Sequence, residues 1–94
     1  MTKLMKVIVN IFGVEVRLKQ EIFLEPASSM LKDVVPVLKD RDHGLLERFI
    51  SDDLSPVDGT VILVNGRNIL SLDRWETKIH DGDELTFMVP VAGG

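Results

Sequence analysis

The last two residues, Gly93 and Gly94, are the part of this sequence that most directly predicts chemistry. Glycine has no Cβ, so a Gly-Gly end adopts backbone angles closed to other residues and can enter a narrow channel. The carboxylate of Gly94 is a poor electrophile, but it can attack the α-phosphate of ATP to give an acyl adenylate. Such a covalent intermediate divides one difficult step into two easier ones. The chain end therefore predicts activation of Gly94 inside the active site of another protein.

The residues before the two glycines give this end its reach. Pro90 lacks a backbone N–H and so favours an end to sheet pairing at that point. From Pro90 to Gly94 the extended chain spans about 17 Å, which is enough to enter a neighbouring active site. We expect Gly93 and Gly94 to form the reacting end, and Val91 and Ala92 to contact the channel.

The sequence assigns the catalytic groups of this reaction to a partner. It contains no cysteine, which excludes disulfides, thiolate metal sites and cysteine nucleophiles. Neither GxxxxGK[ST] nor GxGxxG occurs, so we expect no bound cofactor, and ATP and Mg²⁺ must be held by the partner. The two histidines, His43 and His80, are far apart in the sequence and are interpreted as surface or structural residues. We therefore expect no metal site.

Length and charge limit the class of protein. The 94 residues allow one small domain, without room for an enclosed enzyme active site. A net charge of -4, from 15 acidic and 11 basic residues, argues against a nucleic-acid partner and suggests a protein partner with basic surface. No segment approaches the roughly 20 apolar residues of a membrane span. The first residues lack the features of a signal peptide, so we expect a cytoplasmic protein with no membrane contact.

Alternating residue types predict a first strand at 7–12. Its wholly apolar face, Val7, Val9 and Ile11, is expected in the core, which leaves Ile8 and Phe12 on the outer face. Strand-like segments follow at 14–19 and 21–25. The turn of the first hairpin therefore lies near Gly13 or near Gln20, and the pattern leaves both positions open.

The rest of the sequence predicts one main helix and three more strand segments. Ser28 or Ser29 is the expected N-cap, and Pro36 is expected to kink or shorten the helix. The residues at helical spacing are Met30, Leu31, Val34, Val35 and Leu38. A short helical turn is expected near residues 45–50, and strands at 60–64, 68–70 and 84–89, with Asn65-Gly66 as a hairpin turn. A helix on one face of a mixed sheet makes the fold α+β.

Four segments of this sequence resemble the MoaD/ThiS family of sulfur carriers. They are the end from Asp81 to Gly94, the hairpin Val64-Asn65-Gly66-Arg67, the strand Val9-Asn10-Ile11-Phe12-Gly13 and the helix start Ser29-Met30-Leu31-Lys32-Asp33-Val34. The resemblance implies a β-grasp, ubiquitin-like fold: a mixed sheet of four to five strands with one main helix packed on one face. Residues 1–89 would form this domain, and residues 90–94 a flexible reactive tail.

The same resemblance implies a function. The C-terminal glycine would be adenylated by an activating enzyme of the ubiquitin-activating type, and sulfur would replace the adenylate to give a thiocarboxylate. The Pro90-Val91-Ala92-Gly93-Gly94 ending resembles the molybdopterin branch more than the thiamine branch. The expected acceptor is the large subunit of molybdopterin synthase or another sulfur-accepting enzyme. The chain itself would be a carrier and co-substrate rather than an enzyme.

A docking surface is expected where the first and last strands are neighbours, as the resemblance implies. Ile8, Phe12, Thr86 and Met88 would then share the face away from the helix. Arg67 and Ile69 would border this face from the hairpin. An apolar patch with a polar rim is typical of a protein contact site. The alternative is that Phe12 or Met88 fills the core.

Three functions remain open at this point. The first is a sulfur carrier for molybdopterin or thiamine synthesis. The second is a ubiquitin-like modifier, in which activated Gly94 is joined to lysines of target proteins. The third is an interaction domain whose glycine end is inert, since chain ends are commonly frayed.

Overall fold

The computed structural model describes residues 4–13, 17–25, 30–41, 46, 49–50 and 59–88. Their elements follow in the order β1 (Met5–Phe12), β2 (Arg17–Leu24), α1 (Leu31–Arg41), β3 (Val61–Val64), β4 (Arg67–Asn68), the 3₁₀ turns η2 (Ile69–Ser71) and η3 (Arg74–Glu76), and β5 (Glu84–Met88). Within these residues, no helix has the length and apolar character needed to cross a membrane.

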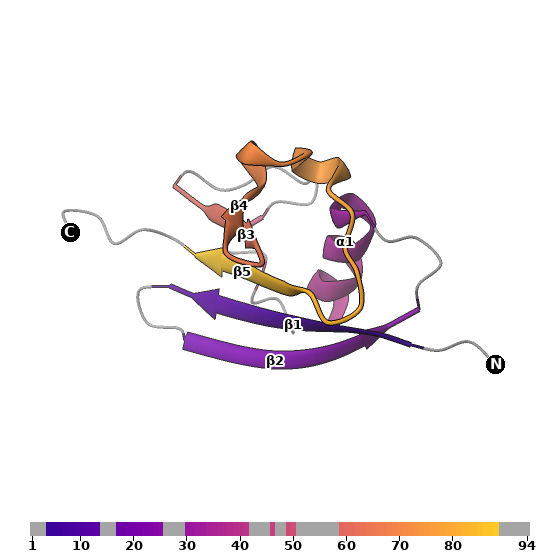
Figure 1. Cartoon of the computed structure of the whole chain (residues 1–94). Coiled ribbons are helices and arrows are strands. Elements are labelled where there is room, and N and C mark those ends of the chain that lie inside the picture. The colour runs from indigo at the N-terminus through magenta and orange to yellow at the C-terminus, as the bar shows by residue number, and fades with distance from the viewer. Residues whose placement is uncertain are drawn as a thin grey trace.

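The strands form one mixed sheet in the order β2-β1-β5-β3-β4. β1 and β5 pair in parallel, whereas the other neighbouring strands pair antiparallel. Figure 1 shows β1 and β5 side by side, with α1 on one side of the sheet. The five strands and one helix confirm the expected β-grasp architecture. The hairpin turn lies between Phe12 and Arg17, so Gln20 belongs to the middle of β2.

The core lies between the sheet and α1. The alternation in β1 predicted its core face correctly, because Val7, Val9 and Ile11 are all buried. Leu85 and Phe87 continue this face on β5. The helix contributes the residues expected from its spacing, Leu31, Val34, Val35 and Leu38, all of which are buried.

Of the two effects expected of Pro36, shortening does not occur, because the helix runs on to Arg41. Proline removes one helical hydrogen bond, but two contacts beyond it favour continuation. Leu38 is fully buried in the core, and the Arg41 guanidinium donates to the Phe23 carbonyl at 2.6 Å. The expected N-cap, Ser28 or Ser29, lies outside the described residues.

The Asn65-Gly66 turn is confirmed. Both residues have positive φ, 52° and 83°, as a two-residue hairpin of this type requires. The Asn65 side chain also joins the turn to the start of β5. Its amide donates to Asp83 at 3.0 Å, and its oxygen accepts from the Glu84 N–H at 2.9 Å.

Two neighbouring segments differ in extent from the sequence prediction. The strand expected at 68–70 is only Arg67–Asn68, because the Asn68 side chain accepts from the Leu70 N–H at 2.9 Å and begins a 3₁₀ turn. The expected helical turn near 45–50 is supported where it is described, since the N–H groups of Phe49 and Ile50 both donate to the Leu46 carbonyl. The last strand ends at Met88 within the described residues, and Val89 lies outside them.

Substitution of Gly66 tests the turn. A Cβ built there meets no atom within 4 Å, so the Gly66→Ala penalty comes from the positive φ alone. We expect a loss of about 1 kcal/mol in the free energy of unfolding, measured by urea denaturation. Gly66→Asn is the matched control and should lose less, because asparagine tolerates this conformation. Equal stability of wild type and Gly66→Ala would contradict the assigned turn.

Candidate docking face and reactive tail

The predicted reactive residues, Val91, Ala92, Gly93 and Gly94, lie outside the described residues. The structure instead fixes where the tail begins. The last described residue of β5, Met88, is aligned with Phe12 on β1 and with Val61 on β3. The described chain therefore ends beside the C-terminal end of β1, near the middle of the sheet.

The sheet face opposite α1 carries the four residues predicted to share one surface. We call this surface the outer face. The parallel register aligns Ile8 with Glu84 and Phe12 with Met88, and Thr86 lies between them on β5. All four predicted residues, Ile8, Phe12, Thr86 and Met88, are half-buried. The alternative that Phe12 or Met88 fills the core is wrong, because Ile11 and Phe87 occupy the core side at that level.

The strand β3 enlarges this face with Val61 and Leu63, which the sequence analysis did not assign to it. Val61 is opposite Met88 and Leu63 is opposite Thr86, so both share the outer face and both are half-buried. An uninterrupted apolar strand does not reveal which of its sides is covered, although Ile62 and Val64 prove to be the buried pair. The apolar part of the outer face is thus Phe12, Met88, Val61 and Leu63, next to the start of the tail.

Two residues predicted to border the outer face do not do so. Ile69 is 5% exposed and belongs to the core, because the 3₁₀ turn after β4 directs the chain back over the helix side. Arg67 is exposed, but it is aligned with Val64, whose side chain is in the core. Directly opposite residues share one face, so Arg67 lies on the helix side of the sheet edge.

The centre of the outer face is polar, which the sequence analysis missed. Asn10 is 7% exposed, and its amide donates to a Glu84 oxygen at 2.8 Å and to the Thr86 hydroxyl at 3.2 Å. Buried polar groups in native proteins are hydrogen-bonded, and these bonds join β1 to β5. One asparagine within an otherwise apolar strand was the available signal.

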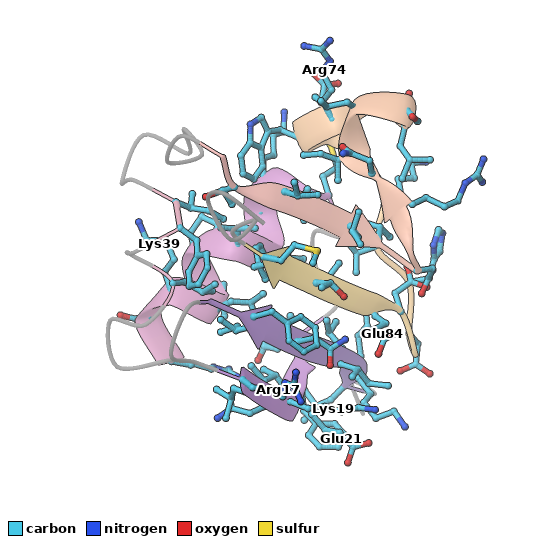
Figure 2. The ribbon with its side chains drawn as sticks, turned by 90° about the vertical axis from the view of Figure 1, so that its left-hand side faces the viewer. Arg17, Lys19, Glu21, Lys39, Arg74 and Glu84 are labelled. Atoms are coloured by element: carbon cyan, nitrogen blue, oxygen red, sulfur yellow. The ribbon has the colours of Figure 1, made fainter. Side chains whose placement is uncertain are left out.

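Charges divide the outer face into two ends. Near the start of the tail, the Arg17 guanidinium lies 6.0 Å from the centre of the Phe12 ring, within the range of a cation–π contact. Toward the other end, Ile8 is aligned with Glu21 on one side and Glu84 on the other, and the Lys6 ammonium lies 3.5 Å from the Glu21 carboxylate. Figure 2 shows Arg17, Lys19 and Glu21 together along β2, and Glu84 on β5. The arrangement suits docking of a partner that has an apolar patch and mixed charges around it.

Other features of the described residues do not form a reaction centre. No group of three or more histidine, aspartate and glutamate side chains in the described ranges is arranged to hold a metal ion. A depression of about 440 Å³ lies beside the 3₁₀ turns, away from the predicted site residues. Its lining is Met30, Leu72, Asp73, Arg74, Glu76 and Lys78.

Known proteins resemble this chain in both sequence and fold. The ThiS family model matches residues 9–94. Small archaeal modifier protein 3 of Haloferax volcanii is 38% identical over 63 residues, which are 66% of each protein. The ubiquitin-related modifier 1 homolog of Caenorhabditis elegans is 33% identical over 73 residues, which are 73% of each.

Solved structures extend the likeness to nearly the whole chain. The small archaeal modifier protein 1 of Methanosarcina acetivorans superposes with a TM-score of 0.71 at 25% identity, over 98% of this chain and 99% of that one. Its fold is the ubiquitin-like β-grasp fold seen here. Proteins of this kind are small carriers rather than enzymes. With a family match that covers almost all of its residues, the chain belongs to the ThiS family of ubiquitin-like proteins.

Proposed function

We propose that this protein is a sulfur carrier whose reactive group is the α-carboxylate of Gly94. The observation that carries the proposal is the family match, which continues through residue 94 and so includes Gly93 and Gly94. The reaction requires a free carboxylate at Gly94. It also requires ATP, and we propose that the activation takes place in the cytoplasm.

The proposed chemistry takes place in an adenylating enzyme of the ubiquitin-activating type. A carboxylate oxygen of Gly94 attacks the α-phosphate of ATP, which forms the acyl adenylate and releases pyrophosphate. A sulfur nucleophile held by a partner then attacks the acyl carbon, and AMP leaves. Where the nucleophile is a persulfide, the product is an acyl disulfide with the partner. A second thiol of the partner then attacks the partner's sulfur of that bond, the S–S bond breaks, the thiocarboxylate leaves, and a disulfide remains on the partner. ATP and Mg²⁺ are bound by the enzyme, so the carrier supplies only the acyl group and the surface that positions it.

The described geometry supports this division between docking and reaction. The last described residue of β5, Met88, belongs to the apolar part of the outer face, and the predicted tail at 90–94 follows it closely in the sequence. The six residues after Met88 can extend about 20 Å. A partner that binds the outer face is therefore within reach of Gly94 while the folded domain stays outside its active site.

For the destination of the sulfur, we propose molybdopterin synthesis, with the large subunit of molybdopterin synthase as the acceptor. The support is the resemblance of the Pro90–Gly94 ending to that branch of the family. Thiamine synthesis is the alternative within the same carrier chemistry.

A second candidate function is protein modification, in which activated Gly94 forms an isopeptide bond with a lysine of a target protein. Two relatives favour it, because the proteins from Haloferax volcanii and Caenorhabditis elegans are both named as modifiers. The carrier and the modifier share the adenylation of Gly94. They differ only in the nucleophile that follows, which is a sulfur compound for the carrier and a lysine of a target protein for the modifier.

Intact mass spectrometry distinguishes these functions. The full chain is incubated with its host's adenylating enzyme, ATP, Mg²⁺ and a sulfur donor. We expect a mass increase equal to the replacement of one oxygen by sulfur, located at Gly94. Deletion of Gly93 and Gly94 should abolish the change without altering thermal stability. Conjugates through Gly94 without a thiocarboxylate would favour the modifier, and an unchanged mass with an active enzyme would refute both.

Met88→Asp tests the outer face. A carboxylate at this half-buried position should weaken binding to the adenylating enzyme by about tenfold or more, because it is placed in the apolar part of the contact. Calorimetric titration measures the affinity. Leu70→Asp is the matched control, since Leu70 is 65% exposed on η2, outside the outer face, and should leave the affinity unchanged. A folded Met88→Asp variant with wild-type affinity would exclude this face as the docking site.

A further inference from the structure

The strand β2 forms one edge of the sheet. Among the described residues it pairs with β1 and with no other strand, although it is eight residues long. Edge strands present a row of backbone N–H and C=O groups that another strand can pair with. Along this edge, Phe23 is 51% exposed, which is unusual for a large apolar side chain.

The hydrogen bonds identify which backbone groups of β2 point outward. The Ile8 N–H donates to Asp83, toward β5, so the backbone groups of the next residue, Val9, point toward β2. Val9 is aligned with Gln20, whose groups therefore point inward. Those of Lys19 and Glu21 point outward. The Phe23 carbonyl has the same orientation, because it accepts from Arg41 rather than from β1.

The order of residues in β2 is complementary to itself about Gln20. In an antiparallel pair of two such strands centred there, Lys19 is opposite Glu21 of the second copy. Arg17 is then opposite Phe23, and Leu18 is opposite Ile22. These are an ion pair, a cation–aromatic pair and an apolar pair, each of which stabilises an antiparallel sheet. Two-fold symmetry produces every pair twice.

We propose that two copies of this chain associate through β2, centred on Gln20, to form one continuous sheet. Lys19 and Glu21 of the second copy exchange both of their backbone hydrogen bonds. Their side chains, like those of Arg17 and Phe23, lie on the outer face, since residues aligned in β1 and β2 share a face. The exposed Phe23 ring then lies against the Arg17 side chain of the second copy.

Charge also selects this register over its neighbours. Each side chain must stay on its own face of the sheet. The two β2 strands can therefore pair only in registers that keep outer-face residues opposite outer-face residues. A shift in one direction places Lys19 opposite Lys19, and a shift in the other places Glu21 opposite Glu21. Like charges directly opposite one another are unfavourable. A lysine at an edge usually prevents strand pairing, but here a glutamate on the second copy is placed to receive it.

The association engages Arg17 and Glu21 at the edge of the outer face but leaves its apolar part, Phe12, Met88, Val61 and Leu63, open. Both outer faces lie on the same side of the continuous sheet. The two tails leave at opposite ends, because the two β2 strands run antiparallel. Pairing of one strand buries less than the roughly 1,200 Å² of stable interfaces. The dimer is therefore weak, with a dissociation constant of about 0.1–1 mM.

Sedimentation velocity on the full chain tests the proposal. Protein concentrations should span the expected dissociation constant, in about 0.15 M salt to limit long-range charge effects. Wild type should shift from monomer to dimer as its concentration rises. Lys19→Glu and Glu21→Lys should each weaken the dimer about tenfold, because each places like charges opposite one another twice. The double variant Lys19→Glu/Glu21→Lys restores opposite charges and should regain the wild-type constant.

Two charge reversals elsewhere are the matched controls. Lys32→Glu on α1 changes the net charge as Lys19→Glu does, and Glu76→Lys on η3 matches Glu21→Lys. Both sites are exposed, and both variants should dimerise as wild type does. Thermal melts confirm that each variant is folded. The proposal is overturned if wild type stays monomeric. It is also overturned if both single variants keep the wild-type dissociation constant, or if the double variant does not regain it.

Discussion

The parallel pairing of β1 with β5 is the constraint on which the rest of this structure depends. It brings the first and last strands of the domain together in the middle of the sheet. Parallel strands cannot be joined by a tight turn, so the helix and the remaining strands are all contained in the connection between them. Because β5 is central, the chain beyond Met88 starts from a rigid part of the sheet rather than from an edge.

The same register produces two surfaces with different roles. Alternate residues of β1 and β5 face α1 and form the centre of the core, whereas their neighbours form the outer face. The bonds from Asn10 to Glu84 and Thr86 cross this pairing within the outer face. A shift of β5 along β1 would break these bonds and expose Phe87, so the position of Met88 is fixed relative to the rest of the outer face.

Local sequence patterns predicted the local features of this fold. The alternation in β1 gave its core face, and Asn65-Gly66 gave the hairpin, because each depends on neighbouring residues alone. The positions of Arg67 and Ile69 were wrong, because the side chain of Asn68 ends β4 after two residues and turns the chain. Val61 lies on the outer face because of how β3 pairs with β5, and the residues of β3 alone do not predict that pairing. That the first and last strands are neighbours was implied by the family resemblance and is confirmed by their pairing.

In the proposed function, the described residues position an acyl group without taking part in its chemistry, and this separation bears on how one fold can serve two functions. The proposal assigns recognition to the outer face and reaction to Gly94, and the six residues after Met88 would reach about 20 Å if extended. A sulfur acceptor and a lysine of a target protein need the same access to Gly94. The nucleophile supplied by the partner therefore determines the product. The features of the outer face on which partners would differ are the polar centre at Asn10 and the Arg17 cation beside Phe12. Under the proposed function, partner choice depends on side chains of the sheet rather than on the glycines.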